Sequence, residues 1–220
     1  MKMILMGCLS FYYCAFSFGQ ERNATNTWLL LQTRLDFKRY LHVMEAGHRR
    51  QDAFLINHRQ SLLRYTLSYQ TNSKRSGFGG GIACFVHERR DAGDLETEIR
   101  PFLQFTQVFF SKNKQLQLRF RNEFRFFNGL TKDQDRLRLQ ALFSHFPVPE
   151  FRTKLIYFNE WFHICGDPRP WEWRAGITIQ QPVFGNWKIG AGYIYQNNEN
   201  SKTRNIHIIQ ISALYEFLLD

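Results

Sequence analysis

The sequence contains few cysteines and prolines, and beyond its first residues it has no long apolar run. Its 220 residues include four cysteines and six prolines, and the mean hydropathy is −0.41. After the N-terminal segment, no stretch reaches the roughly 18 consecutive apolar residues that a membrane-spanning helix needs. A bundle of transmembrane helices is therefore excluded. Cys8 and Cys14 lie in the N-terminal segment, and the two remaining cysteines, Cys84 and Cys165, do not make a disulfide framework.

The first 19 residues have the pattern of a secretory signal peptide. Lys2 supplies a basic start, residues 4–16 form a short apolar core, and Ser17 and Gly19 are small residues before a cleavage site at Gln20. We therefore expect residues 1–19 to be removed and residues 20–220 to form one exported domain. The alternative is that the segment is a buried apolar element of the fold.

Aromatic residues and positive charge are abundant, and they follow a regular pattern. The chain has 22 Phe, 9 Tyr and 5 Trp, with a formal net charge of +10. In QLQLRFRNEFRFF, residues 115–127, apolar and polar side chains alternate one by one. Because successive side chains of a β-strand point to opposite faces, this period of two predicts a strand with one apolar and one charged face.

The same pattern recurs to the end of the chain, whereas no convincing amphipathic helix of normal length appears. We predict strands at about 27–36, 39–49, 61–70, 77–88, 96–109, 114–126, 134–146, 151–163, 171–181, 186–197 and 204–217. Their connections alternate between short turns and longer polar loops, which is typical of an antiparallel up-and-down β-barrel of the outer membrane. Such single-chain bacterial barrels have an even number of strands. We therefore expect a barrel of roughly 10–12 strands: twelve is favoured, with an additional strand within 50–60, and ten would remain if 27–36 lies outside the barrel wall.

Alternation alone does not say which face points outward. In a transmembrane barrel the apolar face contacts lipid, whereas a soluble periplasmic lipocalin-like barrel turns its apolar face inward to bind an apolar ligand. Trp and Tyr near the strand ends are typical of interfacial girdles, and Gly176, Gly190 and Gly192 on the polar face would relieve crowding in a lumen. The alternation from Ile209 to Phe217 is similar to the last-strand signal read by the outer-membrane assembly machinery. The interpretation favoured is a bacterial outer-membrane barrel, with lipid and that machinery as partners.

The chain also resembles a known family over essentially all of residues 20–220. The motifs that carry the resemblance are alternating ones with fixed charges: Glu98-Ile-Arg100 with Gln104, Arg119-Phe-Arg121-Asn-Glu123-Phe-Arg125, Arg136-Leu-Arg138, Asn159-Glu160-Trp161-Phe162, Arg174 with Gly176, and Gly192-Tyr193. They resemble the DUF2490 family of uncharacterised Gram-negative outer-membrane β-barrel proteins. The resemblance implies an outer-membrane barrel, and no established biochemical activity comes with it.

On the barrel interpretation, a set of charged side chains lines one side of the lumen. These residues are Glu98, Arg100, Arg119, Arg121, Glu123, Arg125, Arg136, Arg138, Glu160 and Arg174. One hypothesis is a structural role, in which ion pairs fill the lumen and make the barrel rigid. The other is a narrow passage or pocket for a small anionic solute, because arginines outnumber carboxylates and guanidinium groups bind carboxylate and phosphate through two hydrogen bonds.

An outer-membrane lipid hydrolase is a further alternative, but no catalytic motif supports it. Ser144 and His145 are adjacent and so point to opposite faces of a strand, and two other pairings would depend on tertiary structure: Ser68 with His87 and Ser212 with His42. We therefore expect no enzymatic activity. We also expect no metal, because His163 and Cys165 have no second pair of ligands, no other cofactor, and no nucleic-acid partner, because the basic residues form no single patch.

Overall fold

The computed structural model describes residues 23–51, 57–88, 95–111, 113–128, 133–147, 152–167, 171–198 and 205–219. The expected signal peptide, residues 1–19, lies outside these described residues. The described chain forms eleven strands: β1 (Asn23–Phe37), β2 (Tyr40–Gln51), β3 (Asn57–Gln70), β4 (Ser76–Glu88), β5 (Leu95–Ser111), β6 (Lys114–Asn128), β7 (Gln134–His145), β8 (Lys154–Ile164), β9 (Trp171–Pro182), β10 (Trp187–Asn198) and β11 (Asn205–Leu219). Among the described residues, no helix is long and apolar enough to cross a membrane.

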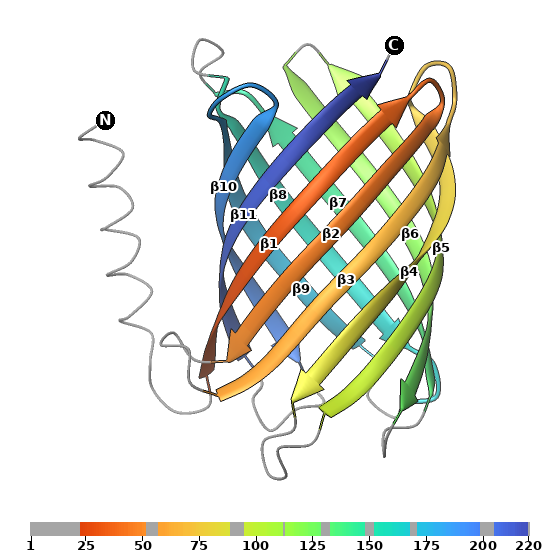
Figure 1. The fold of residues 1–220 in the computed structure, drawn as a ribbon, viewed down its shortest axis with the longest axis vertical. Coiled ribbons are helices and arrows are strands. Elements are labelled where there is room, and N and C mark those ends of the chain that lie inside the picture. Colours follow the sequence, from red (N-terminus) through yellow and green to blue (C-terminus); the bar gives the residue numbers. More distant parts are fainter. Residues whose placement is uncertain are drawn as a thin grey trace, which may run out of the picture.

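The strands form one closed barrel in which each strand pairs with its neighbours in the sequence (Figure 1). All sequential pairs are antiparallel, so the predicted all-β, up-and-down barrel is confirmed. The predicted strand positions are also confirmed, because every observed strand overlaps one predicted segment.

The closed barrel has eleven strands, which confirms the expected range of roughly 10–12, but the favoured number of twelve is wrong. In the segment 50–60, β2 continues to Gln51 and β3 begins at Asn57, so these two strands take up the residues assigned to a twelfth. The alternative of ten strands is also wrong, because β1 belongs to the wall. In an up-and-down chain of odd strand number, the first and last strands run in the same direction. The barrel therefore closes through a parallel pair, β1 with β11, in which Leu29 lies opposite Ile211.

The tightest turns of the barrel, 38–39 and 112–113, lie at one end, which we call the short-turn end. The other connections at this end are 71–75, 183–186 and the longer segment 146–153. The connections at the other end, the long-loop end, lie largely outside the described residues. Lys38 has φ of 54° in the two-residue turn between β1 and β2, a left-handed conformation typical of such tight turns. β1 and β11 both begin at the long-loop end and finish at the short-turn end.

The strand alternation places the apolar side chains on the outside of the wall and the charged ones inside. The exposed face carries Leu31, Leu63, Phe78, Ile99, Leu103, Phe120, Leu139, Ile179, Ile189 and Ile211 among many other large apolar residues. The buried set is largely polar and charged and includes Glu98, Arg100, Arg121, Glu123, Arg136 and Glu160. In most folded proteins the distribution is the opposite, with charged side chains mainly on the surface and large apolar side chains mainly inside.

A small apolar core occupies the half of the interior nearest the long loops. Leu62, Ala83 and Phe85 form one cluster, and Ile194, Ile206 and Ile208 form another, with the Trp28 side chain packed against both. The interior is crowded on this side. A methyl group at Gly176 would lie 2.6 Å from the Phe158 ring and from the Tyr193 carbonyl oxygen, so glycine is needed there for space.

Candidate functional site

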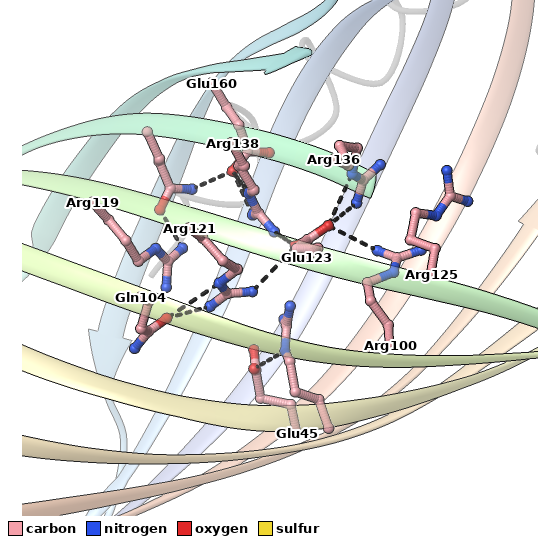
Figure 2. Close-up of polar contacts among 12 residues, drawn as sticks. Glu45, Arg100, Gln104, Arg119, Arg121, Glu123, Arg125, Arg136, Arg138 and Glu160 are labelled. Carbon is pink, nitrogen blue, oxygen red and sulfur yellow. Dashed lines mark hydrogen bonds and ion pairs between the residues drawn. The ribbon is translucent and has the colours of Figure 1, made fainter. Parts of the chain in front are cut away.

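Three buried glutamates organise the polar interior of the barrel. Glu98 comes from β5, Glu123 from β6 and Glu160 from β8, and all three are almost completely inaccessible to solvent. Each carboxylate contacts two or more arginines: Glu98 and Glu123 have partners on their own and on neighbouring strands, whereas the partners of Glu160 come from β7 and β9. Figure 2 shows the part of this arrangement around Glu123 and Glu160. The strands bring these residues together because alternate positions of adjacent strands share the inner face. We call these three glutamates and their arginine partners the ion-pair network.

Glu123 is the centre of this network. Its Oε2 atom accepts a hydrogen bond of 2.8 Å from Arg136 Nε and lies 3.5 Å from Arg100 Nη1. Its Oε1 atom lies 3.4 Å from Arg138 Nη1 and 3.6 Å from Arg121 Nη1. One carboxylate therefore contacts four guanidinium groups from three strands, β5, β6 and β7. A buried charge of this kind is tolerated only because it is paired and hydrogen-bonded on several sides.

Glu98 and Glu160 extend the network on either side. Glu98 Oε1 accepts hydrogen bonds of 2.7 Å from the Nε atoms of Arg100 and Arg125. Glu160 Oε1 accepts a hydrogen bond of 2.6 Å from Arg138 Nε, and its Oε2 atom lies 3.7 Å from Arg174 Nη1. Because Arg100 and Arg138 each contact two glutamates, the three carboxylates belong to one connected system.

Aromatic rings on the inner face pack against the guanidinium groups. The Arg100 guanidinium lies 4.1 Å from the Phe85 ring centroid, and that of Arg121 lies 4.1 Å from the Phe102 centroid. Arg136 and Arg174 contact the buried Phe162 ring at 4.6 and 4.7 Å. Such stacking is favourable by roughly 0.5–2 kcal/mol per contact, depending on how far the pair is removed from water. These inward-facing rings were not predicted, because they occupy positions of the inner face at which the alternating pattern predicts polar residues.

The network contains more positive than negative charge. The ten predicted residues comprise seven arginines and three glutamates, a formal excess of four positive charges. The excess is most acute at Arg119, which hydrogen-bonds the neutral Gln140 amide and, among the described residues, has no carboxylate within 4.0 Å. Arg121 donates to Gln104 Oε1 from Nε and Nη2, at 3.2 and 2.7 Å, and its one carboxylate neighbour is the shared Glu123. Arg119, which lies beside the network, and Arg121, which belongs to it, are therefore two adjacent inward-facing cations of β6 with incomplete neutralisation.

A cavity of about 450 Å³ lies in the short-turn half of the barrel, and Arg119 and Arg121 form part of its wall. The other polar residues that line it are Gln32, Arg34, Glu45, Arg64, Thr66, Ser68, Gln70, Lys74, Ser76, Gln104, Thr106, Gln115 and Gln117. Its volume falls within the usual range of small-molecule sites. Lys74 and Ser76 belong to the β3–β4 connection and its edge, so the cavity extends to the short-turn end.

Most other cations of the cavity wall are paired with carboxylates. Arg64 hydrogen-bonds Glu45 across β2 and β3, and Lys74 Nζ lies 3.1 Å from Asp36 Oδ2. Arg34 Nη2 lies 3.7 Å from the same carboxylate oxygen. The deep end of the cavity, at Arg119 and Arg121, therefore has the clearest surplus of positive charge.

The structure places all ten predicted lumen residues on the inner face. Nine of them belong to the ion-pair network: Glu98, Arg100, Arg121, Glu123, Arg125, Arg136, Arg138, Glu160 and Arg174. Arg119 lies beside the network and has Gln140 as its partner. Of the residues that line the cavity, the prediction included only Arg119 and Arg121, and it missed the others, among them Glu45, Arg64 and Gln117. The signal that could have identified them is their position on the polar face of their strands.

The residue pairs considered for catalysis are not brought together. Ser144 is buried on the inner face, whereas the adjacent His145 ring stacks on Tyr157, 5.8 Å between centroids. The remaining serines and histidines have other neighbours: Ser68 accepts a hydrogen bond from Gln104, His87 contacts Glu98, and His42 Nδ1 lies 2.8 Å from the Tyr65 hydroxyl. Both described cysteines, Cys84 and Cys165, are free. In the part of the chain that the structure describes, no three His, Cys, Asp or Glu side chains are grouped as metal ligands.

The chain matches the profile of a protein family. No curated protein matches the chain. The profile of a family described as "Protein of unknown function (DUF2490)" matches residues 25–207, which covers ten of the eleven strands in full or nearly so and the start of β11. This match includes every residue of the ion-pair network and confirms the family resemblance seen in the sequence. The protein therefore belongs to the DUF2490 family.

Proposed function

We propose that the protein is a bacterial outer-membrane barrel whose lumen binds a small anionic solute beside Arg119 and Arg121. The outer face supports the membrane location. Large apolar side chains such as Leu63, Phe78, Leu103 and Ile189 are more than half exposed to solvent. Exposed apolar residues continue around the wall, far beyond the isolated patches that soluble monomers usually present. Hydrocarbon tails would cover this surface without cost.

Aromatic residues near both ends of the barrel also support a membrane location. At the short-turn end, the Tyr40 and Tyr69 rings are 5.7 Å apart and those of Trp187 and Tyr215 are 4.9 Å apart. At the long-loop end, the Trp173 and Tyr195 rings are 5.3 Å apart. In β10, Trp187 and Tyr195 are eight residues apart, or about 27 Å along the strand, which corresponds to about 20 Å along the barrel axis when the strand is tilted by roughly 40°. Girdles at about this separation flank the lipid-facing band of outer-membrane barrels.

The observation that carries the anion proposal is the incomplete neutralisation of Arg119 and Arg121. Arg121 is 2% exposed, and its nearest carboxylate, Glu123, is shared with three other arginines. Leaving guanidinium groups inside a barrel without counterions is costly, because the field is less screened there than in water. An anion in the adjacent cavity would supply the missing charge, and two neighbouring guanidinium groups can hold a carboxylate or phosphate through several hydrogen bonds.

The ion-pair network gives the barrel a second, structural role. Its arginines and glutamates, together with the Phe162 ring, occupy the interior next to the cavity. A barrel of this strand number is intermediate between those filled by side chains and those with an aqueous channel. We therefore propose binding or narrow passage of a small anion, and not an open diffusion pore.

Cell fractionation tests the membrane location. The protein should remain with the outer membrane after washing at high salt and alkaline pH, and detergent should be needed to extract it. Its electrophoretic mobility should change on heating, as expected of a barrel that resists unfolding in detergent. Recovery of the folded protein in the soluble periplasmic fraction would contradict the proposal and favour a soluble barrel.

Calorimetric titration of the detergent-solubilised barrel with inorganic phosphate tests the anion site. The wild-type protein should bind phosphate, whereas Arg119→Gln should lose most of the affinity. Arg125→Gln is the matched control, because Arg125 is an inward-facing arginine of the same strand that belongs to the ion-pair network and does not line the cavity. Equal loss in the two variants would indicate a general effect of lumen charge and would contradict a site at Arg119.

A further inference from the structure

The side chains that line the cavity change from cationic at its deep end to amide and aromatic at its mouth. On β5 and β6, inward-facing residues form four successive cross-strand pairs: Arg121 with Gln104, Arg119 with Thr106, Gln117 with Val108, and Gln115 with Phe110. Successive pairs are two residues apart, or about 7 Å along the strands. The cationic pairs therefore lie deep beside the ion-pair network, the amides lie farther out, and an aromatic ring stands at the mouth.

The amides along this path are available to a ligand. Among the described residues, the side chains of Gln32, Gln115 and Gln117 make no hydrogen bond with another protein group, although all three line the cavity. An amide can donate through its nitrogen and accept through its oxygen, and this is the combination that a hydroxyl group needs. Thr106, which lies opposite Arg119, adds a hydroxyl group to the same wall.

Apolar groups lie between the polar ones. Val43, Val108 and Leu142 line the cavity, and the inward-facing Phe110 ring at its mouth is 56% exposed. An aromatic side chain left this exposed on the polar inner face has no packing role in the barrel. A ligand with hydroxyl groups on its edges and C–H groups on its faces would match this mixture of amide and apolar surface.

We infer that the cavity binds an acidic sugar, with its carboxylate or phosphate group at Arg119 and Arg121. The ring then lies between Gln117 and the apolar residues, and further substituents extend toward Phe110. This inference rests on the proposed anion site and adds to it the class of ligand. A simple inorganic anion would use only the two arginines at the deep end, and it would leave the amides and the Phe110 ring without a partner.

Titration of the full-length barrel in detergent with matched ligands tests the inference. Glucuronate should bind at least about tenfold more tightly than acetate, and glucose 6-phosphate at least about tenfold more tightly than inorganic phosphate. Neutral glucose should bind too weakly to measure. The two acidic sugars also distinguish a carboxylate site from a phosphate site. If acetate and glucuronate bind equally well, the sugar inference is wrong and the anion site stands. If no anion binds, both proposals fail.

Two substitutions separate recognition of the hydroxyl groups from recognition of the charge. Gln117→Leu should weaken glucuronate binding about tenfold and leave acetate binding unchanged. Phe110→Ala should weaken a glucuronate disaccharide more than glucuronate itself. The matched control is Gln210→Leu, because Gln210 alternates onto the inner face with the buried Ile208 and does not line the cavity. Equal effects of Gln117→Leu and Gln210→Leu on glucuronate binding would overturn the assignment.

Discussion

Phe120 and Arg121 are neighbours in β6, and their side chains lie on opposite sides of the barrel wall. The Phe120 ring is 47% exposed on the outside, whereas the Arg121 guanidinium stacks on Phe102 inside. One peptide unit thus separates the surface that we propose to contact lipid from the charged interior. This relationship makes the lipid-facing side directly testable by substitution.

Phe120→Arg should lower the free energy of unfolding of the barrel in lipid bilayers by about 2–4 kcal/mol, because a charge near the bilayer midplane loses its hydration. Phe217→Arg is the control, because Phe217 is also exposed but lies at the short-turn end of β11, where the cost falls to about 0–1 kcal/mol. Urea titration of protein folded into liposomes measures both values. A small and equal effect of the two substitutions would argue against a lipid-facing wall.

Glu123→Gln should destabilise the barrel by about 3–5 kcal/mol, because four buried arginines lose a shared counterion. Glu216→Gln is the corresponding control at the barrel rim. Glu216 forms an ion pair with Lys188, both side chains are partly solvated, and we expect a loss below about 1 kcal/mol. The midpoints of urea unfolding in detergent measure the stability of the two variants. If Glu123→Gln is no more destabilising than Glu216→Gln, the ion-pair network does not stabilise the barrel.

Arg119→Gln should raise the free energy of unfolding of the empty barrel by about 1 kcal/mol, because it removes a positive charge that has no carboxylate partner. Arg136→Gln should lower it, because Arg136 hydrogen-bonds the buried Glu123. Adding phosphate should stabilise the wild-type barrel and leave the Arg119 variant unchanged. If Arg119→Gln is as destabilising as Arg136→Gln, then Arg119 serves the packing of the lumen.

Two engineered disulfides test the parallel closure of the barrel. In a chain whose native cysteines are all replaced by serine, Leu29→Cys with Ile211→Cys should form a disulfide, as should Leu35→Cys with Phe217→Cys in a separate variant. Both pairs face each other only if β1 and β11 are parallel, because an antiparallel closure that aligned one pair would separate the other. Non-reducing electrophoresis and intact mass report the cross-link, and formation of only one of the two would contradict the observed closure.

The strands were predictable because the chemistry repeats within each of them. In β6 the alternation from Gln115 to Phe126 is visible in the sequence, and it places each side chain on its observed face. All eleven strand patterns were visible as well, but the rule that single-chain barrels have an even strand number led to the prediction of twelve. Whether the number of strands is odd or even depends on whether the first and last strands pair in parallel or antiparallel. The residue pattern within β1 is the same in both cases.

The charged residues of the lumen were identified from the sequence, but their partners were not. Arg138 contacts Glu160 and Glu123, which lie 22 positions after it and 15 before it, and only the register between β6, β7 and β8 brings the three together. The cavity could not be predicted from the sequence for a related reason. It exists because the side chains of Gln115 and Gln117 leave space that the arginines farther along β6 fill, and packing volume has no signature in the alternation.

The odd strand number has a consequence for topology mapping. Asn23 begins β1 at the long-loop end, and Leu219 finishes β11 at the short-turn end. An epitope placed just before Asn23 and another placed after Leu219 would therefore be displayed on opposite sides of a bilayer. On intact cells, an antibody should detect one of the two and miss the other until the envelope is permeabilised.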